Sequence, residues 1–543
     1  MQIEAQKALN RENWIRVGCS TCGLAAGAEG VYQTLKEELA ERKLDIEVRR
    51  TGCNGMCHAE PLVEINVSGV PRTMYGNLKP EYVKDLLNTH LKKEKIAKQW
   101  KVDGVEALGQ DDCGKPSASK QVRIVLCNCG IVDPTNIDDY IARCGYQGLK
   151  RALQEYGSEG VIEQLKLSGL RGRGGGGYPT HLKWEFVRRE KSAEKYMICN
   201  GDEGDPGAYM DRSVLEGDPH AVVEGMIIAG YAIGATMGYF YIRAEYPLAV
   251  ERIENAIRQA RRLGLLGKNI LGTDFSYDLE VRLGAGAFVC GEETALMSSV
   301  EGRRGYPWPR PPFPAQKGLW GNPSNINNVE TLANVPAIMR NGGKWFAQFG
   351  TEESKGTKVF AVTGNVRKAG LIEIPMGTTL NTIVYDICGG PALGSNEVKA
   401  VQTGGPSGGV IPARFFETHV SYESLLRLGS IMGSGGLIVM DEQDSMVEIA
   451  KFYLGFCVEE SCGKCAPCRI GGRQMLMLLN RISKGEGTTA DIDALKRISH
   501  AMQKASLCGL GQTAPNPVLS TLRYFENEYT ALLKDGAQAA GAR

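Results

Sequence analysis

Four cysteines near the C-terminal end have a spacing that can hold a metal cluster. Cys462, Cys465 and Cys468 follow one another at two-residue intervals, and Cys508 comes after a gap of 39 residues. Three thiolates at such short intervals can bind one face of a cubane, and a remote fourth thiolate completes the site. Zinc sites more often use two separated pairs of ligands. The spacing therefore predicts a [4Fe–4S] cluster.

A second group of cysteines lies near the N-terminus, as the pairs Cys19-x2-Cys22 and Cys53-x3-Cys57. The sequence around them predicts a small α/β unit, with helical segments over 31–42 and 83–91 and strands over 44–48 and 61–67. Loops of such a unit can bring the two pairs to one site. Four thiolates suit zinc or a [2Fe–2S] cluster, and the spacing alone leaves both open.

The remaining eight cysteines are spaced less regularly: Cys113, Cys127, Cys129, Cys144, Cys199, Cys290, Cys388 and Cys457. The first four could form another metal site, but their irregular spacing favours free thiols. Cys199 and Cys290 end apolar runs, which predicts small buried side chains. The first residues do not have the basic and apolar regions of a secretory signal. Because disulfides are rare in a reducing cytosol, we expect a cytoplasmic protein with thiols and metal ligands.

A glycine-rich run, Gly172-Arg-Gly-Gly-Gly-Gly-Tyr-Pro-Thr180, lies between two expected helices, over 149–167 and from about 181. Glycines can turn peptide N–H groups toward an anion without obstruction by a Cβ atom, and the next helix adds the positive end of its dipole. Arg173 and Lys183 can add charge. No convincing strand precedes the run, so an ordinary Rossmann fingerprint is not expected. A flexible linker also fits badly, because amphipathic helices flank the run.

An acidic loop follows the expected strand 196–198 and contains Asn200, Asp202, Glu203 and Asp205. Carboxylate and amide groups at a strand end suit the hydroxyls of a ribityl or ribose chain. A solvated acidic turn is the alternative interpretation. A similar loop, 291–293, lies between an expected strand over 286–290 and an expected helix over 294–300.

Two more segments complete the set. A proline-rich stretch, 306–314, would hold Arg310 and Phe313 rigidly, and an amide-rich turn over 325–331 would cap a helix. With Tyr178 and Phe186, these loops predict one large polar cofactor with aromatic neighbours.

The composition limits the class of protein. The 543 residues suffice for three or four domains of about 100–200 residues. With 63 basic and 62 acidic side chains the net charge is +1, which provides little to bind nucleic acid or an anionic membrane. Segment 225–242 is nominally long enough to span a bilayer, but its glycines and β-like end predict a buried helix passing into a strand. Segment 92–119 is predicted to be a linker, and 121–126 a strand that opens the next domain.

Five motifs in a fixed order resemble the flavin-bearing NADH-oxidising subunit of respiratory complex I: GLRGRGGGGYPTHLKW, NGDEGDPGAYMDR, CGEETAL, PPFPAQKGLWGNPSNINNVETL and SCGKCAPCRIGGR. They resemble still more its soluble relatives in NAD-dependent [FeFe]-hydrogenases and NAD-linked formate dehydrogenases. The resemblance covers about residues 121–530. The first 90 residues or so resemble the thioredoxin-like [2Fe–2S] domain that some relatives carry at the N-terminus.

This resemblance implies an α/β multidomain protein. Its expected parts are a thioredoxin-like [2Fe–2S] domain (1–95), a linker (96–120), a Rossmann-like FMN- and NAD(H)-binding domain (121–355), a β-grasp-like ligand-binding domain (356–442) and a helical bundle with the [4Fe–4S] cluster (443–543). Helical periodicity over 447–456, 475–482 and 492–505 agrees with the bundle.

The resemblance also implies the roles of individual residues. The expected FMN-binding residues are Gly172, Arg173, Gly174, Gly175, Gly177, Lys183, Asn200, Asp202, Glu203, Gly291, Glu292, Asn327 and Asn328. The expected NAD-binding residues are Tyr178, Phe186, Asp205, Glu293, Arg310 and Phe313. The expected metal ligands are Cys462, Cys465, Cys468 and Cys508, together with Cys19, Cys22, Cys53 and Cys57.

Two departures from the family pattern matter. Asp205 stands where the complex I pattern has Glu, so its contact with the dinucleotide could be shorter or changed. The first cysteine pair, Cys19-x2-Cys22, is tighter than is usual in the separate thioredoxin-like subunit, which puts ligation by both cysteines in doubt.

The expected function is that of an NAD(H)-oxidising or -reducing diaphorase subunit. A hydride passes from NADH to FMN, and single electrons then pass to iron–sulfur clusters. The expected assembly is a soluble hetero-oligomeric [FeFe]-hydrogenase with a catalytic subunit and a small thioredoxin-like [2Fe–2S] subunit. A formate dehydrogenase or an electron-bifurcating complex is the alternative assembly. The non-enzymatic alternative is a zinc-stabilised scaffold or nucleotide sensor.

Overall fold

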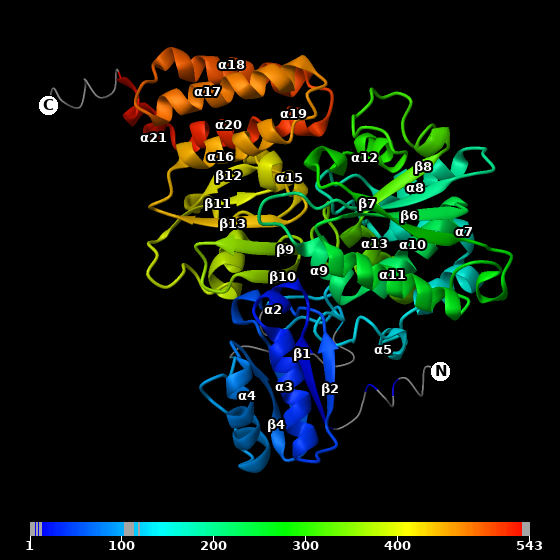
Figure 1. The fold of residues 1–543 in the computed structure, drawn as a ribbon. Coiled ribbons are helices and arrows are strands. Elements are labelled where there is room, and N and C mark those ends of the chain that lie inside the picture. The colour runs from blue at the N-terminus through cyan, green and yellow to red at the C-terminus, as the bar shows by residue number, and fades with distance from the viewer. Residues whose placement is uncertain (1–5, 7–8, 10–12, 103–112, 118–119, 535–543) are drawn as a thin grey trace.

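The computed structural model describes residues 6, 9, 13–102, 113–117 and 120–534. Three sheets and a group of C-terminal helices follow one another along the chain, and the sheet nearest the N-terminus lies at the opposite end of the molecule from the helices (Figure 1). Parts of the expected linker, 103–112 and 118–119, and the end of the expected bundle, 535–543, lie outside the described residues. Within the described ranges, no helix has both the length and the apolar character needed to cross a bilayer.

The N-terminal unit is a four-stranded sheet with helices packed on it. Its elements are β1 (Trp14–Gly18), α2 (Thr21–Ala25), α3 (Ala28–Glu41), β2 (Glu47–Thr51), β3 (Val63–Val67), β4 (Val70–Tyr75) and α4 (Pro80–Leu87). The strand order is β2-β1-β3-β4, with β1 parallel to β2 and antiparallel to β3. Helix α3 buries Val31, Leu35 and Leu39 at four-residue spacing, as the periodicity predicts.

This unit extends beyond the expected boundary at residue 95. Ala97 is buried in its hydrophobic core, and the ring of Trp100 stacks on Tyr82 with the centroids 5.5 Å apart. The start of the expected linker is therefore part of the N-terminal fold.

The predicted strand over 121–126 is wrong. The backbone amides of Val125 and Leu126 donate to the carboxylate of Glu373 at 3.0 and 2.9 Å instead of pairing with a neighbouring strand. An apolar run resembles a strand in the sequence, but these amides bind a buried side chain from a distant part of the chain.

The central part contains a fully parallel four-stranded sheet. Its strands are β5 (Tyr196–Gly201), β6 (Met237–Arg243), β7 (Asp278–Gly284) and β8 (Ser324–Asn328), in the order β7-β6-β5-β8. The helices of this part are α5 (Ile137–Ala142), α6 (Gln147–Arg151), α7 (Gly157–Ser168), α8 (Thr180–Arg189), α9 (Met210–Gly217), α10 (Pro219–Ile233), α11 (Pro247–Arg262), α12 (Glu293–Val300), α13 (Val329–Asn341) and α14 (Gly343–Phe346). The segment 225–242 is a buried helix that leads into a strand, as predicted.

Two local predictions in this part need correction. Residues 286–290 do not form a strand: β7 ends at Gly284, and Phe288–Gly291 is a 3-10 turn. Gly286 has φ +82°, which ends the extended conformation. The expected amide-rich turn is largely strand β8, and only its last part caps a helix, where the Asn328 side chain accepts from the amide of Glu330 at the start of α13.

A second sheet follows, of mixed direction. Its strands are β9 (Thr357–Gly364), β10 (Gly370–Pro375), β11 (Val398–Thr403), β12 (Gly409–Pro412) and β13 (Gly436–Asp441), in the order β10-β9-β13-β11-β12. Strands β9 and β13 are parallel, and the other neighbours are antiparallel. The amide of Leu371 in β10 donates to the carbonyl of Gly55 at 2.8 Å, so this sheet edge contacts the N-terminal unit (Figure 1).

The C-terminal part is helical, as predicted. Its helices are α16 (Met446–Glu459), α17 (Gly472–Ser483), α18 (Thr489–Ala505), α19 (Gly509–Thr513), α20 (Asn516–Tyr524) and α21 (Glu526–Ala531). Leu454, Met475, Leu479 and Leu495 from the first three of these helices share one core. The periodicity over 447–456, 475–482 and 492–505 is confirmed by α16, α17 and α18.

Candidate functional site

The site lies at the point where the order of the parallel strands reverses. Strands β5 and β8 are neighbours, and Asn200 at the end of one pairs in register with Asn328 at the end of the other. The chain leaves β5 toward β6 on one side and returns in β8 on the other. In open parallel sheets, ligands bind in the crevice outside such strand ends.

The glycine-rich loop closes one wall of this crevice. Gly175 forms an isolated β-bridge with Gly433, and a Cβ atom on Gly175 would lie 3.2 Å from the Cα atom of Gly433. Gly177 has φ +60°, and a Cβ atom there would lie 2.7 Å from the ring of Tyr422. The hydroxyl of Tyr422 donates to the carbonyl of Gly172 at 2.8 Å. Glycine is therefore required where this loop touches the 422–433 region.

Arg173 does not direct its charge into the crevice. Its guanidinium is fully buried and donates to the carbonyls of Thr357, Arg171 and Lys355 at 3.0, 2.9 and 2.7 Å. The cation of this loop that lines the crevice is Arg171, which also pairs with Glu423. The expectation that Arg173 supplies the charge was therefore wrong by two positions on the same loop.

The acidic loop after β5 surrounds the other side of the crevice. Asn200 donates to the carbonyl of Gly291 at 2.9 Å and accepts from the amide of Asp202 at 3.0 Å. The carboxylate of Glu203 accepts from the amides of Asp211 and Arg212 and so caps helix α9. These bonds hold the loop in place without using the side chain of Asp202.

Asp202 has a carboxylate that the protein itself leaves without partners. Both of its oxygens are buried without a hydrogen-bond partner, and the residue lines the crevice. Burial raises the pKa of Asp202 to about 7, against the attraction of Arg243. Burial likewise raises the pKa of Asp205 to about 6, against the hydrogen bond donated by the hydroxyl of Ser434 at 2.6 Å.

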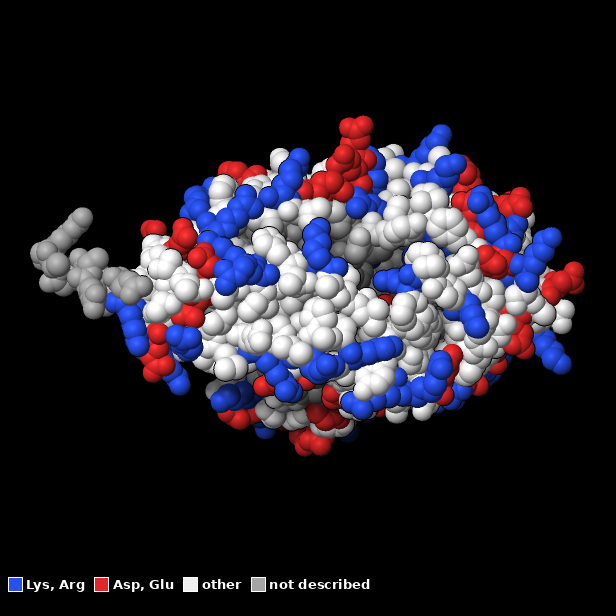
Figure 2. All heavy atoms as spheres, turned by 90° about the horizontal axis from the view of Figure 1, so that it is seen from above, with Lys and Arg blue, Asp and Glu red and all other residues white. Residues whose placement is uncertain are grey.

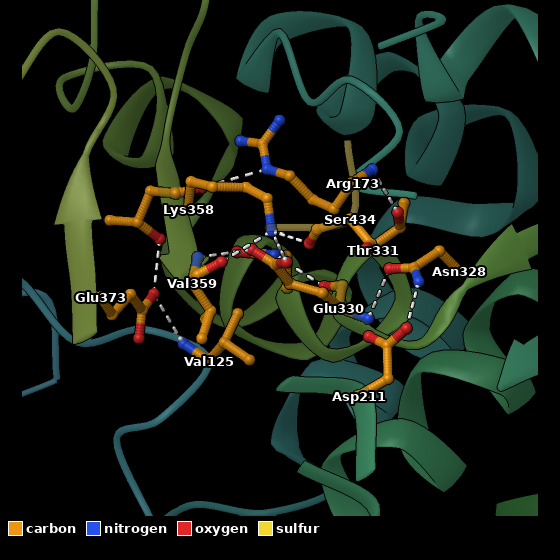
Figure 3. A network of polar contacts seen from close by, with 12 residues as sticks. Val125, Arg173, Asp211, Asn328, Glu330, Thr331, Lys358, Val359, Glu373 and Ser434 are labelled. Atoms are coloured by element: carbon orange, nitrogen blue, oxygen red, sulfur yellow. Dashed lines mark hydrogen bonds and ion pairs between the residues drawn. The ribbon is translucent and has the colours of Figure 1, made fainter. Parts of the chain in front are cut away.

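A buried polar network supports the crevice from behind (Figure 3). The ammonium group of Lys358 pairs with Glu330 and donates to the carbonyls of Val359 and Ser434 at 2.8 and 2.6 Å. Asn328 donates to the carboxylate of Asp211 at 2.5 Å. Burial and the nearby carboxylates of Glu203 and Glu330 raise the pKa of Asp211 well above its usual range.

The crevice has a volume of about 580 Å³, within the ~300–1,000 Å³ of ligand pockets. Predicted FMN residues that line it are Gly174, Gly175, Asn200, Asp202, Glu203, Gly291, Glu292 and Asn328, and the predicted NAD residue Asp205 joins them. Lining residues that were not predicted from the sequence include Arg171, Asp211, Tyr422, Glu423, Met432, Gly433 and Ser434. Asp211 belongs to the same motif as Asp202, whereas 422–434 gave no local signal because it reaches the crevice from the second sheet.

Other predicted residues lie outside the lining of this crevice. The side chain of Asn327 is buried and accepts from the indole of Trp184 at 2.7 Å. Lys183 donates to the carbonyl of Ile326 at 2.8 Å and lies 3.4 Å from Glu293. Glu293 also pairs with Arg310 at 2.6 Å, so this carboxylate lies between two cations. Three predicted aromatic side chains are about half exposed: Tyr178, Phe186 and Phe313.

The C-terminal cysteines are brought together by the fold. Cys462, Cys465, Cys468 and Cys508 line one small cavity, together with Val289, Pro307, Ser461, Lys464, Leu507 and Leu510. The hydroxyl of Ser461 lies 3.2 Å from the sulfur of Cys468. The spacing predicts this convergence correctly, because a short loop after α16 places three sulfurs and the start of α19 supplies the fourth.

The N-terminal cysteines converge only in part. The sulfurs of Cys53 and Cys57 are 3.6 Å apart, and the thiol of Cys22 is in hydrogen-bonding contact with Cys57. Cys19 is buried in the hydrophobic core of the unit, and the strongest charges acting on its thiol are those of Arg50 and Glu29. The structure therefore groups three of the four predicted ligands.

The expectation of free thiols at Cys113 and Cys127 is wrong, because the two form a disulfide. Arg143 contacts both sulfurs, at 3.8 and 3.5 Å. Cys129 and Cys144 are free. The expectation failed because spacing along the chain does not reveal that residue 113 returns to residue 127.

The geometry defines a nucleotide-type crevice beside a four-cysteine cavity. The family model described as the Nuo51 FMN-binding domain matches residues 165–337, and that of the NADH-ubiquinone oxidoreductase-F iron-sulfur binding region matches residues 448–532. The chain belongs to this family of flavin- and iron–sulfur-binding NADH-oxidising subunits.

Individual relatives agree with this assignment. The chain is 57% identical to "NADP-reducing hydrogenase subunit HndC" of Solidesulfovibrio fructosivorans, over 77% of this chain and 84% of that protein. It is 43% identical to an F-type component of NADH-quinone oxidoreductase from Rhizobium meliloti (strain 1021), over 76% of this chain and 98% of that protein. Among solved structures, an NAD+-reducing [NiFe]-hydrogenase in the H2-reduced state matches with a TM-score of 0.68 and 29% identity, over 98% of this chain and 87% of that one.

The residues of the crevice fit FMN. The two carboxylate oxygens of Asp202 have no partner in the protein and can accept from hydroxyl or N–H groups of a ligand. Glycines at 174 and 175 leave the peptide groups of the loop open to a phosphate. Four cysteine thiols around one cavity likewise fit a [4Fe–4S] cluster.

Proposed function

We propose that this chain is the NAD(H)-oxidising or -reducing diaphorase subunit of a soluble, multi-subunit NAD-dependent [FeFe]-hydrogenase. One observation carries the electron-transfer part of the proposal: Val289 and Leu510 line both the flavin crevice and the cavity of the four C-terminal cysteines. A single layer of apolar side chains therefore separates the two sites. When bound, FMN accepts two electrons together from NADH and releases them singly, as an iron–sulfur cluster requires.

In this proposal, the protein binds and orients FMN through the glycine loop and the acidic loop. The peptide groups of Gly174 and Gly175, with Arg171, face the phosphate, and Asn200, Asp202 and Asn328 face the polar chain of the cofactor. Glu203 and Arg173 position these loops from behind, since their side chains already bind backbone groups.

The dinucleotide is proposed to bind at the open side of the crevice. The half-exposed rings of Tyr178, Phe186 and Phe313 are available for stacking on nicotinamide or adenine. Glu293 and Arg310 would supply polar contacts at the rim, and Asp205 would contact the dinucleotide from inside the crevice. Because Asp205 already accepts from Ser434, that contact is shared between ligand and protein.

We propose the finer fold assignments on the observed topologies. The N-terminal unit has the α/β order expected for a thioredoxin-like domain holding a [2Fe–2S] cluster. The central parallel sheet is Rossmann-like, with its site at the reversal point. The second sheet, in which a hairpin (β9, β10) is followed by a helical turn and returning strands, is β-grasp-like.

The partner subunits are proposed to bind at the helical end of the molecule. Seen from above, this face has a broad area of uncharged side chains bordered by lysines and arginines (Figure 2). Exposed apolar side chains of the helical part include Ile470, two positions after Cys468, and Met477. Such a surface suits a catalytic hydrogenase subunit and a small [2Fe–2S] subunit in the cytoplasm.

The visible spectrum of anaerobically purified protein tests the proposal. We expect flavin absorption together with broad iron–sulfur absorption, and bleaching on addition of NADH. A colourless zinc protein would support the scaffold alternative and reject the enzyme. Affinity capture of the native complex then identifies the partner: a hydrogenase catalytic subunit is expected, whereas a formate dehydrogenase subunit or a bifurcating assembly would reject the hydrogenase assignment alone.

A further inference from the structure

The three converging N-terminal cysteines leave one ligand position to be filled. Cys22, Cys53 and Cys57 are grouped, while Cys19 lies in the core among Ala28, Val31 and other apolar side chains. A [2Fe–2S] cluster needs two protein ligands on each iron, which makes four. The fourth ligand has to come from a side chain that already faces the three sulfurs.

Glu60 is that side chain. It is 7% exposed, and its Oε2 accepts from the amide of Leu62 at 2.9 Å. Its Oε1 is buried without a hydrogen-bond partner. The thiol of Cys53 lies close enough to act on the carboxylate. One oxygen is therefore held by the backbone, and the other is free for a ligand that the protein does not supply.

The carboxylate also lies over the turn that carries Cys22. A Cβ atom built on Gly23 would be 3.1 Å from Oε2 of Glu60, and one built on Gly18 would be 3.2 Å from both oxygens. The glycines on either side of this turn thus leave the space that the carboxylate occupies. Because Glu60 follows Cys57 by three residues, the two belong to one short loop.

We propose that the N-terminal [2Fe–2S] cluster is held by Cys22, Cys53, Cys57 and Glu60, and that Cys19 is not a ligand. This inference rests on the proposed function, which includes that cluster. A carboxylate oxygen carries the same single negative charge as a thiolate and is an established ligand of iron and zinc. The pair Cys19-x2-Cys22 then contributes one ligand, and its tight spacing ceases to be a difficulty.

Donors from outside the ligand set support the same grouping. The amide of Gly55 donates to the sulfur of Cys53 at 3.3 Å. Arg212 of helix α9 donates to the sulfur of Cys22 at 3.7 Å, and Tyr209 lies beside Cys57. Such donors stabilise charged ligands around a metal centre. They surround the three grouped cysteines and come partly from the central domain.

Three variants of the full chain, purified anaerobically, test the ligand set. Glu60→Gln keeps the size of the side chain and an oxygen for the Leu62 amide but loses the anionic ligand. Cys19→Ser removes the excluded thiol, and Cys22→Ser is the reference for loss of a ligand. The measurements are iron and acid-labile sulfide per chain and the EPR signal of the dithionite-reduced [2Fe–2S] cluster.

We expect Cys19→Ser to retain the [2Fe–2S] signal and both Glu60→Gln and Cys22→Ser to lose most of it. Retention of the signal in Glu60→Gln, or its loss in Cys19→Ser, would overturn the proposal. A wild-type chain without any [2Fe–2S] signal would overturn it too, while bleaching of FMN by NADH tests the rest of the proposed function separately.

A fourth variant separates ligation from a structural role of Glu60. In Glu60→Cys a thiolate can replace the carboxylate, so we expect a retained cluster with changed g values and visible absorption. If Glu60 only supports the loop, that variant either loses the cluster or leaves its spectrum unchanged, and either result rejects ligation. The [4Fe–4S] signal and FMN content of every variant show whether the chain is folded.

Discussion

Lys358 and Glu330 form a fully buried ion pair behind the flavin crevice (Figure 3). Lys358 comes from β9 of the second sheet and Glu330 from the first turn of α13, and their side chains are 0% and 1% exposed. The carboxylate also accepts from the amide of Val359 at 2.9 Å. The pair therefore joins the two sheets beside Asn328 and Ser434, two lining residues of the crevice.

Removing one partner of this pair should be strongly destabilising. Lys358→Met leaves the carboxylate of Glu330 buried without its cation, which costs about 3–5 kcal/mol. We expect a lower urea midpoint of the FMN-free protein and a lower FMN content. The double variant Lys358→Met/Glu330→Gln should recover part of the loss. Lys120→Met, in an exposed pair with Asp386, is the control and should change stability by less than about 1 kcal/mol. Equal effects of the two single variants would contradict the assignment.

The stability of the FMN-free protein should fall as the pH rises through the titration of Asp202. Its folded pKa of about 7 lies above the ordinary value, so the folded state binds the proton more tightly than the unfolded state. Stability is then lost between about pH 4 and pH 7. Asp202→Asn should stabilise the FMN-free protein by about 2 kcal/mol at pH 8 and by less at pH 5.

Thermal unfolding at the two pH values measures this effect. The exposed Asp274 provides the matched control, because Asp274→Asn removes a carboxylate in contact with solvent. A pH dependence that Asp202→Asn leaves unchanged would show that the carboxyl of Asp202 is not the titrating group.

Glu293→Gln should weaken NADH binding more than FMN binding. The carboxylate lies between Lys183 and Arg310 at the rim, outside the lining of the crevice. Its loss should raise the KM for NADH by about tenfold, the equivalent of ~1.4 kcal/mol, and leave the FMN content unchanged. Glu280→Gln, which breaks an exposed pair with Arg282 on β7, should change neither. Loss of FMN before any loss of NADH affinity would reject this division of the site.

Cys465→Ser should separate flavin reduction from onward electron transfer. The variant removes one of four thiols around the C-terminal cavity, so the EPR signal of the [4Fe–4S] cluster should disappear. Because Val289 and Leu510 stand between the two sites, FMN should stay bound and still be bleached by NADH. Electron delivery to the partner complex should fall at least tenfold. A variant that retains FMN but is no longer bleached would show that the order of transfer is different.

Local patterns were sufficient to predict much of the secondary structure around the site. The C-terminal helices, the buried helix and strand over 225–242, and the convergence of Cys462, Cys465, Cys468 and Cys508 all follow from periodicity and spacing. Most of these features depend on residues close together along the chain. The two strand predictions that failed, 121–126 and 286–290, were apolar runs whose backbone is bound by a distant carboxylate or interrupted by a glycine of positive φ.

The order of motifs along the chain was enough to define the chemistry and the family: a glycine loop, an acidic loop after a strand and two cysteine groups. Which of these groups face a ligand was settled by the packing of distant segments. It turned Arg173 into the protein and Arg171 toward the crevice, separated Cys19 from three other thiols and brought Glu60 to them. The physical reason is that the direction of a side chain depends on contacts between parts far apart along the chain, which residue spacing does not encode.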